Sequence, residues 1–274
     1  MAVFLRGLLP WRKQLPYLNI SKSNAIYYHL IDGDPHRPHV VFLHEGLGCA
    51  AMWKNFPEQL CRRTGCAGVV YDRLGYGRSS PLRNDRTLNY IHEYALQELP
   101  EVLTAVIPDC PYILIGHSDG ASIALVHAAQ APRRLRGVIT EAAHVFVEQI
   151  TIEGIEEAER GWRQGKFRGL DKYHGTRAEA VFKAWTDTWL AHWFREWTIE
   201  NLLEGIAAPL LVIQGADDQY GSIGQVDAIV AGSSSSAQRL IIEGCGHAPH
   251  LEAREVVLNA MADFINLLDH TYSF

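Results

Sequence analysis

The sequence predicts an α/β fold, in which a mostly parallel sheet of about eight strands is flanked by helices. The first observation is that short β-rich runs alternate with longer helical runs along the 274 residues, which is typical of strand–helix–strand units. The second is that several strand candidates, such as 40–43 and 112–115, are continuously apolar, as expected of strands covered by helices on both faces. The third is a composition of 47% hydrophobic and 20% charged residues, which is ordinary for a globular chain with a core.

The strand candidates follow in order from the N-terminus. An early segment, 17–20, lies close enough in sequence to the next one to pair with it as an antiparallel hairpin at the sheet edge. The remaining candidates are 25–31, 39–44, 68–72, 112–116, 135–140, 210–214 and 239–243. Helix candidates between them include 88–107, 119–130 and 254–268.

The alternation breaks once, after the sixth strand. Residues 146–204 contain no strand candidate and follow a helical pattern that is polar on one side and aromatic on the other. The strand pattern returns after Ala207-Ala208-Pro209. The simplest interpretation is one core domain, formed by 1–145 and 205–274, with a helical insertion at 146–204.

The insertion also holds five of the seven tryptophans. Trp185, Trp189, Trp193 and Trp197 recur every four residues, so on one continuous helix they form a single aromatic stripe. Such a stripe usually packs a helix against its neighbours. The alternative is that Trp185 and Trp189 line an apolar substrate pocket. For Trp53, too, the sequence leaves open whether it packs within the core or lines the pocket.

Charge and cysteine content exclude several classes of protein. Lys and Arg total 25 against 31 for Asp and Glu, a net charge of −6, so the basic surface that binds nucleic-acid phosphates is not expected. Five cysteines without CxxC spacing argue against a disulfide framework or a structural zinc site and suit a reducing compartment. Residues 1–16 lack the apolar stretch of a signal peptide. We therefore expect a soluble, cytoplasmic protein with no membrane insertion.

A G-x-S-x-G pattern marks the candidate nucleophile. Gly-His-Ser-Asp-Gly at 116–120 follows an apolar strand and opens a helix of small residues. A turn this tight strains the serine backbone, and larger side chains at the flanking glycines would clash with neighbouring elements. The turn is expected to raise the Ser118 hydroxyl above the carboxyl edge of the sheet, where the first amides of the helix face developing negative charge.

A serine needs a base to accept its proton. His247 is the best candidate among the 13 histidines, because it follows a strand directly within Gly-Cys-Gly-His at 244–247, and ligands gather at the carboxyl ends of such strands. His250 is the competitor, and we expect it to begin the last helix and to serve structure.

The base in turn needs a carboxylate to orient it. The strand 210–214 runs directly into Asp217 and Asp218, and one of these is expected to be that acid. Their alternative interpretation is a turn that leads to a helix cap at Ser222. The order Ser, Asp, His along the chain favours the catalytic interpretation.

The reaction also needs donors for the oxyanion of the tetrahedral intermediate. The backbone amide of Asp119, next to the nucleophile, is one candidate. The second is expected from His-Glu-Gly-Leu-Gly at 44–48, which follows the strand candidate 39–44.

Together these patterns resemble the serine-nucleophile branch of the α/β-hydrolase superfamily over nearly the whole chain. The segments 44–48 and 72–79 resemble that family's H-G-x-x-G oxyanion loop and D-x-x-G-x-G-x-S loop. The segments 116–120, 215–218 and 246–247 match its nucleophile elbow, acid turn and base loop. The resemblance implies an α/β-hydrolase fold with a helical lid inserted after the sixth strand.

The resemblance also assigns roles to residues. It implies Asp218 as the acid, because this residue is the third after the glycine of the acid turn. Serine at 118 excludes the haloalkane dehalogenases and epoxide hydrolases of this fold, which use an aspartate nucleophile. Glu45 stands where the family usually has glycine, so Gly46 is chosen as the second amide donor. Asp119 also departs from the family pattern, and its carboxylate must turn away from the oxyanion.

The expected activity is hydrolysis of a small, largely apolar carboxylic ester by Ser118, His247 and Asp218 through an acyl-enzyme. Glu45, Trp53, Trp185 and Trp189 are the candidate substrate-binding residues. No cofactor is implied, and the pair His247-x-x-His250 is not assigned to a metal.

Three alternatives remain open. A carbon–carbon bond hydrolase acting on a vinylogous diketone, or a lactonase, would use the same triad. Such substrates carry carboxylates and call for an arginine in the pocket, whereas Arg73 and Arg78 are expected to brace loops. A small-molecule receptor of this fold would hydrolyse its ligand very slowly. The expected partner is a small-molecule substrate, and the chain is expected to be a monomer or a homodimer.

Overall fold

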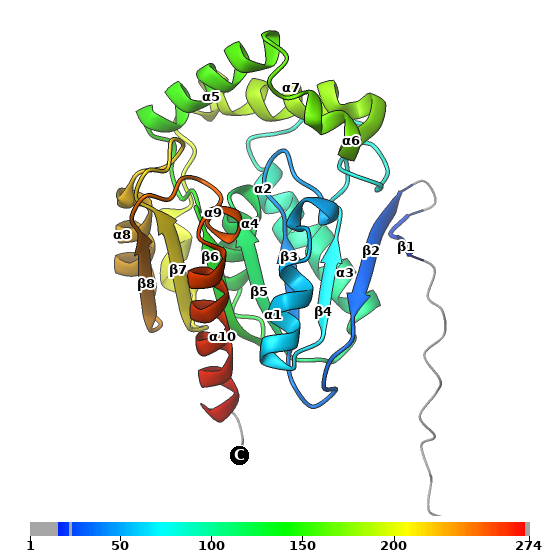
Figure 1. Cartoon of the computed structure of the whole chain (residues 1–274), viewed down its shortest axis with the longest axis vertical. Coiled ribbons are helices and arrows are strands. Elements are labelled where there is room, and N and C mark those ends of the chain that lie inside the picture. The colour runs from blue at the N-terminus through cyan, green and yellow to red at the C-terminus, as the bar shows by residue number, and fades with distance from the viewer. Residues whose placement is uncertain (1–15, 22–23, 272–274) are drawn as a thin grey trace, which may run out of the picture.

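The computed structural model describes residues 16–21 and 24–271. The prediction about a signal peptide falls on residues 1–16 and so lies almost entirely outside the described residues. The described residues form one eight-stranded sheet in the order β1-β2-β4-β3-β5-β6-β7-β8 (Figure 1). The predicted α/β fold with a mostly parallel sheet is confirmed.

The strands lie close to the predicted segments. They are β1 Tyr17–Asn19, β2 Ala25–Ile31, β3 His39–Leu43, β4 Gly68–Tyr71, β5 Tyr112–His117, β6 Leu135–Glu141, β7 Leu210–Gly215 and β8 Ala237–Ile242. The first two pair antiparallel, as the hairpin prediction required, and β2 also runs antiparallel to β4. All other pairings are parallel, so the carboxyl ends of β3 to β8 meet at one edge of the sheet.

Helices cover both faces of the sheet, which explains the continuously apolar strands. The helices are α1 Phe56–Thr64, α2 Tyr90–Glu93, α3 Leu99–Val106, α4 Asp119–Ala128, α5 Gln149–Arg163, α6 Asp171–His174, α7 Ala178–Trp189, α8 Ile223–Gly232, α9 Pro249–Glu252 and α10 Arg254–Thr271. In Figure 1, α1 and α10 lie in front of the sheet, and α3 and α4 lie behind it. Every residue of β5 and of α4 is buried, so the element that carries the candidate nucleophile is the centre of the fold.

The predicted helix at 88–107 is interrupted. It consists of α2, a π-helical turn at Tyr94–Glu98, and α3. Pro100 lies in the first turn of α3 and lacks the N–H that would bond to the carbonyl of Leu96. A widened turn before the proline accommodates this missing bond.

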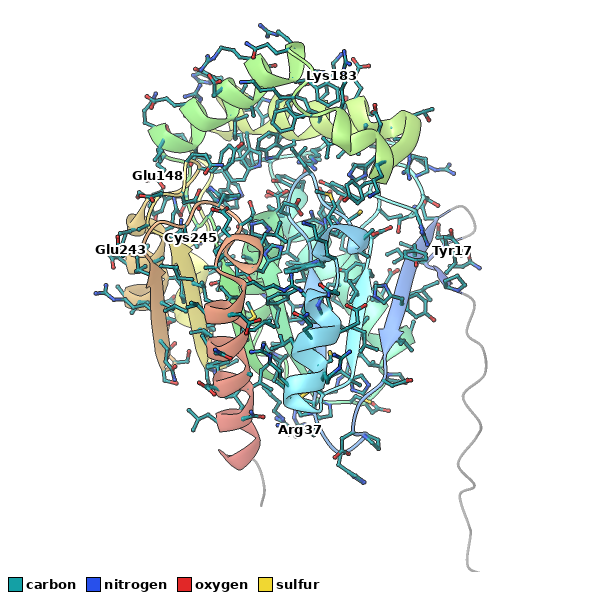
Figure 2. The ribbon with its side chains drawn as sticks, in the orientation of Figure 1. Tyr17, Arg37, Glu148, Lys183, Glu243 and Cys245 are labelled. Carbon is teal, nitrogen blue, oxygen red and sulfur yellow. The ribbon has the colours of Figure 1, made fainter. Side chains whose placement is uncertain are left out.

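The insertion between β6 and β7 contains α5, α6 and α7 together with short 3₁₀ segments. Figure 1 shows these helices lying above the carboxyl ends of the strands, and Figure 2 shows side chains filling the space between them and the sheet. The outer faces of these helices carry exposed ion pairs, such as Lys183 with Glu179 and Arg163 with Glu159. The insertion is therefore amphipathic and turns its apolar side to the sheet.

The predicted four-tryptophan stripe on one helix is wrong. Helix α7 ends at Trp189, and Trp193 is 49% exposed. The chain turns back here because it must return to β7: Ile199 N–H donates to Val145 at 2.8 Å, beside the start of the insertion. Trp197 then packs against Trp189 from a different segment, with 5.7 Å between ring centroids.

Candidate active site

Ser118 occupies a strained turn between β5 and α4. Its backbone has φ 52° and ψ −119°, a region that non-glycine residues rarely adopt and that functional sites retain. A side chain at Gly120 is excluded, since a Cβ there would lie 2.1 Å from the carbonyl oxygen of Leu43. The tight packing of α4 on β3 thus holds the serine at the carboxyl edge of the sheet.

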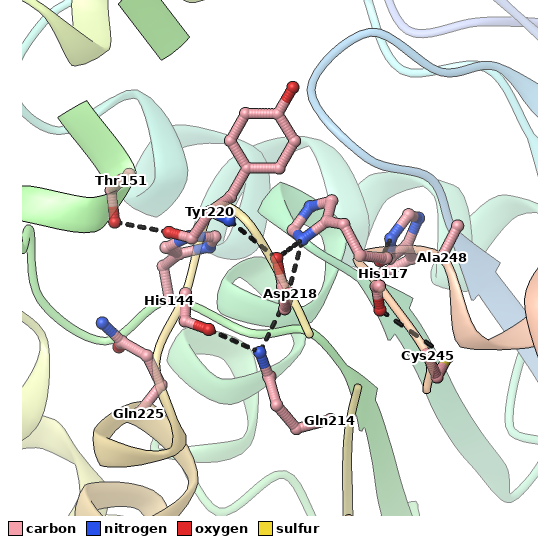
Figure 3. A network of polar contacts seen from close by, with 12 residues as sticks. His117, His144, Thr151, Gln214, Asp218, Tyr220, Gln225, Cys245 and Ala248 are labelled. Atoms are coloured by element: carbon pink, nitrogen blue, oxygen red, sulfur yellow. Dashed lines mark hydrogen bonds and ion pairs between the residues drawn. The ribbon is translucent and has the colours of Figure 1, made fainter. Parts of the chain in front are cut away.

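His247 and Asp218 form a hydrogen-bonded pair in the loops after β8 and β7. The Nδ1 atom of His247 lies 2.9 and 2.8 Å from the two carboxylate oxygens of Asp218. Gln214 Nε2 and the Tyr220 amide also donate to this carboxylate, at 2.7 and 2.8 Å, and Figure 3 shows Asp218 between these two residues. Burial favours a higher pKa for Asp218, but the His247 and Tyr220 hydrogen bonds outweigh it and lower this pKa below its ordinary value.

Asp218, and not its neighbour, is therefore the carboxylate that contacts His247. Asp217 is exposed, while the side chain of Asp218 is fully buried against the imidazole. Ser222 does cap α8, by accepting a hydrogen bond from Gly224 N–H at 3.1 Å. One loop therefore provides both features: Ser222 caps the helix, and Asp218 contacts His247.

The His247 loop is held by hydrogen bonds from two sides. His117 Nε2 lies 2.7 Å from the carbonyl oxygen of His247 and donates to it. Burial, followed by the neighbouring histidines, lowers the pKa of His117 well below its ordinary value, so its ring is neutral. Glu252 accepts hydrogen bonds from the amides of Gly246 and Ala248, on either side of the base, at 2.7 and 3.0 Å.

His250 serves structure, as predicted from the sequence, although it lies in α9 and not at the start of the last helix. Its ring and its amide both bond to one carboxylate oxygen of Glu141, at 2.8 and 3.1 Å. Glu141 ends β6 and is fully buried. This pair ties the base loop to the centre of the sheet.

Ser118 and His247 line one small cavity of about 10 Å³, which is space for about one water molecule. Three further predicted residues, Asp119, Trp185 and Trp189, also line it. The other lining residues are His144, Thr151, Ile155 and Tyr220. The serine, the base and the two tryptophans of α7 thus come together, although they are far apart in sequence.

The two predicted donors to an oxyanion are the backbone amides of Asp119 and Gly46. Asp119 is the first residue of α4, so its N–H has no partner one turn earlier in the helix. The Gly46 amide donates no hydrogen bond within the part of the chain that the structure describes. A Cβ at Gly46 would lie 2.7 Å from Cδ1 of Trp185, so glycine lets this loop approach the cavity closely.

Comparison with known proteins identifies the family. Residues 40–260 match the alpha/beta hydrolase family. The chain belongs to the alpha/beta hydrolase family. A proline iminopeptidase of Lactobacillus helveticus is 22% identical to this hydrolase, over 89% of this chain and 95% of that protein. The 2-hydroxy-6-oxononadienedioate/2-hydroxy-6-oxononatrienedioate hydrolase of Paraburkholderia xenovorans is 25% identical, over 91% of this chain and 94% of that protein.

A solved structure shares the fold of this hydrolase. The thermophilic esterase from Thermogutta terrifontis superposes with a TM-score of 0.68 at 19% identity, covering 92% of this chain and 97% of that one. At 19% identity, this likeness is evidence for a shared fold alone. The two relatives, a proline iminopeptidase and a 2-hydroxy-6-oxononadienedioate/2-hydroxy-6-oxononatrienedioate hydrolase, are both hydrolases but differ in their named substrates.

The sequence required the Asp119 side chain to turn away from the oxyanion, but a Cβ at Gly46 would lie only 3.2 Å from its Oδ2. The carboxylate of Asp119 therefore stays close to the oxyanion loop, where it contacts buried polar groups. Its Oδ2 accepts a hydrogen bond from the Tyr90 hydroxyl at 3.1 Å and lies 3.9 Å from Arg86 Nη1. The side chains of Arg86 and Asp119 are only 3% and 1% exposed. Tyr90 in turn accepts a hydrogen bond from Trp189 Nε1 at 3.0 Å. The insertion is thereby linked through Tyr90 to the residue beside the nucleophile.

Glu45 and Trp53 do not join the catalytic cavity. Both line a second cavity of about 60 Å³, together with His117 and His250. The pKa of Glu45 is raised, because burial outweighs the nearby positive charges. The structure therefore separates these two residues from Trp185 and Trp189, with which the sequence had grouped them.

Arg73 and Arg78 brace loops, as expected. Arg73 Nη2 donates to the carbonyl of Glu45 in the oxyanion loop at 2.9 Å. Arg78 Nη1 donates to the Tyr27 hydroxyl at 3.0 Å. Each arginine ties its loop to a neighbouring segment.

Several site residues were not found from the sequence. His144 follows the carboxyl end of β6, so the placement rule that pointed to His247 applies to it as well. Tyr90 and Arg86 carry no such signal, because only the folded chain brings them to Asp119.

Within residues 16–21 and 24–271, no cluster of His, Cys, Asp and Glu has the composition of a metal site. Across the same residues, no helix has both the length and the hydropathy needed to cross a membrane. The five cysteines are free thiols.

Proposed function

We propose that this hydrolase cleaves small, uncharged carboxylic esters through a Ser118–His247–Asp218 triad and an acyl-enzyme. The observation that carries the proposal is the cavity that Ser118 and His247 share, with His247 Nδ1 bonded to a buried Asp218 carboxylate at 2.8 Å. The bond to Asp218 leaves Nε2 of His247 as the nitrogen free to accept the serine proton.

The reaction begins when the Ser118 oxygen attacks the ester carbonyl carbon and its proton passes to His247 Nε2. The amides of Asp119 and Gly46 donate to the oxyanion. As the intermediate collapses, the bond to the alcohol oxygen breaks and His247 returns its proton to that oxygen. His247 then takes a proton from water, and the hydroxide attacks the acyl-serine. As the bond to the Ser118 oxygen breaks and the acid leaves, His247 returns this proton to that oxygen and restores the hydroxyl.

The residues lining the cavity favour an uncharged substrate. Among the described residues that line it there is neither Arg nor Lys, and the buried Arg86 already faces Asp119. A carboxylate-bearing diketone or lactone would enter this cavity without a cationic partner. Carbon–carbon bond hydrolysis is nevertheless the second candidate, because a relative with that kind of substrate is 25% identical over 91% of this chain.

Residues 146–204 act as a lid in this proposal. Trp185 and Trp189 roof a cavity of about 10 Å³, which holds about one water molecule. Any ester is larger than this, so the lining side chains of α5 and α7 must make room before a substrate reaches Ser118. The side chains of this insertion then select the small-molecule substrate.

A panel of four substrate types tests the proposal. Wild-type enzyme is assayed on a p-nitrophenyl ester, a lactone, a vinylogous diketone carrying a carboxylate, and a prolyl arylamide, each alongside Ser118→Ala. We expect the highest kcat/KM on the ester and a loss on the order of 10⁴- to 10⁶-fold in the variant. A higher kcat/KM on the diketone would replace the proposed reaction by the second candidate. Single-turnover hydrolysis of every substrate would identify a receptor.

A further inference from the structure

His144 lies in the catalytic cavity but has no place in the triad or among the oxyanion donors. It follows β6, is 3% exposed, and lines the cavity with Ser118 and His247. Its ring centroid lies 5.9 Å from that of His247 and 5.1 Å from that of Trp189. The ring therefore stands beside the reacting groups, between the base and the insertion.

One hydrogen bond fixes which nitrogen of His144 carries a proton. Its Nε2 lies 3.1 Å from the backbone carbonyl oxygen of Tyr220, and a carbonyl only accepts. The Thr151 hydroxyl donates to the same oxygen at 2.6 Å (Figure 3). Burial lowers the pKa of His144, and the neighbouring His247 lowers it further. The ring is thus neutral, with its proton on Nε2 and a lone pair on Nδ1.

That lone pair has no partner. Nδ1 of His144 is buried and accepts no hydrogen bond from any described residue. A buried acceptor without a donor is costly, and native structures keep few of them without a functional reason. A bound group that donates a hydrogen bond to Nδ1 would remove this cost.

We propose that His144 Nδ1 accepts a hydrogen bond from a hydroxyl of the substrate and so selects hydroxylated esters. This inference rests on the proposed function and names the substrate class within it. His144 is then a specificity-determining residue, which contacts the substrate without taking part in proton transfer.

The geometry places this hydroxyl near the scissile bond. Ser118 hands its proton to His247, whose ring lies 5.9 Å from that of His144. Because Ser118, His247 and His144 line one cavity, a hydroxyl bonded to His144 lies in the same cavity as the scissile carbonyl. Two carboxylates, Asp119 and Asp218, also act on His144, but Asp119 lies 3.9 Å from Arg86 and Asp218 lies 2.8 Å from His247. Each carboxylate thus already faces a basic partner, so a neutral hydroxyl fits this site better than an ammonium group.

The test compares butanoate esters that differ in one hydroxyl. The 2-hydroxybutanoyl and 3-hydroxybutanoyl p-nitrophenyl esters are measured against the butanoyl ester, and the 2-hydroxyethyl ester of butanoic acid against its ethyl ester. For at least one hydroxylated ester we expect wild-type kcat/KM to exceed that of its partner on the order of 10- to 100-fold. Equal kcat/KM within every pair overturns the proposal.

Three variants distinguish a role of His144 in substrate selection from a purely structural role. His144→Phe keeps an aromatic ring but removes the acceptor. It should bring the ratio of kcat/KM between a hydroxylated ester and its unhydroxylated partner to about one. His144→Gln restores an acceptor and should recover part of the preference. Thr151→Val removes the other hydrogen bond to the Tyr220 carbonyl and should keep the wild-type ratio, whatever its effect on the individual rates. An unchanged ratio in His144→Phe overturns the proposal.

Two further measurements keep this test separate from that of the proposed function. If wild-type enzyme hydrolyses no ester, the ester-hydrolase proposal fails, and Kd values of the same pairs on Ser118→Ala decide the role of His144. Tighter binding of the hydroxylated ester of a pair supports the proposed role of His144, and equal binding of both esters overturns that role. A 2-aminobutanoyl ester that reacts faster than every hydroxylated ester overturns the choice of a hydroxyl.

Discussion

Replacing Asp218 by Asn tests how the acid works while leaving the shape of the site intact. The carboxylate accepts from His247 at 2.8 Å, from Gln214 at 2.7 Å and from the Tyr220 amide at 2.8 Å. An amide has only one acceptor oxygen, which the Gln214 and Tyr220 donors compete to occupy. Its NH2 group then faces His247, so Nδ1 must act as acceptor and the proton moves to Nε2.

The expected loss of kcat follows from this change of tautomer. With its proton on Nε2, His247 cannot accept the proton of Ser118, so general-base catalysis is lost. We expect kcat on a p-nitrophenyl ester to fall on the order of 10⁴-fold, as the same replacement does in other Ser-His-Asp enzymes. KM should change little, because Asp218 does not line the cavity.

Asp217→Asn is the matched control. It removes the same charge one residue away, from a side chain that is exposed and bonds to neither His247 nor Gln214. We expect its kcat to stay within about twofold of wild type, since surface substitutions rarely matter. Comparable losses in the two variants, or a kcat above about one tenth of wild type in Asp218→Asn, would refute the assigned role.

Three further changes probe the site and its support. Gly46→Ala places a Cβ 2.7 Å from Cδ1 of Trp185, and by displacing the oxyanion loop it should lower kcat on the order of 10²-fold; an unchanged kcat would contradict the role given to this loop. Tyr90→Phe removes the bonds to Asp119 and Trp189, and urea unfolding should show a loss of about 1–3 kcal/mol; no loss would contradict the link. Burial raises the pKa of Glu98 to about 8, so the folded state holds a proton that the unfolded chain releases. Wild-type stability should fall as pH rises from about 5 to 8, whereas Glu98→Gln should show a flatter profile over that range.

The sequence predicted the parts of the site that follow strands directly. Ser118 and Asp218 follow the buried parallel strands β5 and β7, and His247 follows the parallel edge strand β8. The carboxyl ends of these strands must meet at one edge of the sheet. Local patterns therefore carried three-dimensional information, and the strand segments agree with the structure.

The surroundings of the triad could not be predicted in the same way. Tyr90 contacts Asp119 and Trp189 across 29 and 99 residues of sequence, and no local pattern encodes such contacts. Glu45 is adjacent to the oxyanion glycine, yet it lines a different cavity, because neighbouring residues in a loop point in different directions. The four-residue spacing of the tryptophans misled for a similar reason, since the chain turns back after Trp189 to reach β7.

The most direct test of the account is to find the nucleophile. Full-length protein is treated with a fluorophosphonate, which phosphonylates activated serines, and the adduct is mapped by peptide mass spectrometry. The account predicts a single adduct on Ser118, with none in Ser118→Ala and much slower labelling in Asp218→Asn. An adduct on another serine, or undiminished labelling of Ser118→Ala, would contradict it.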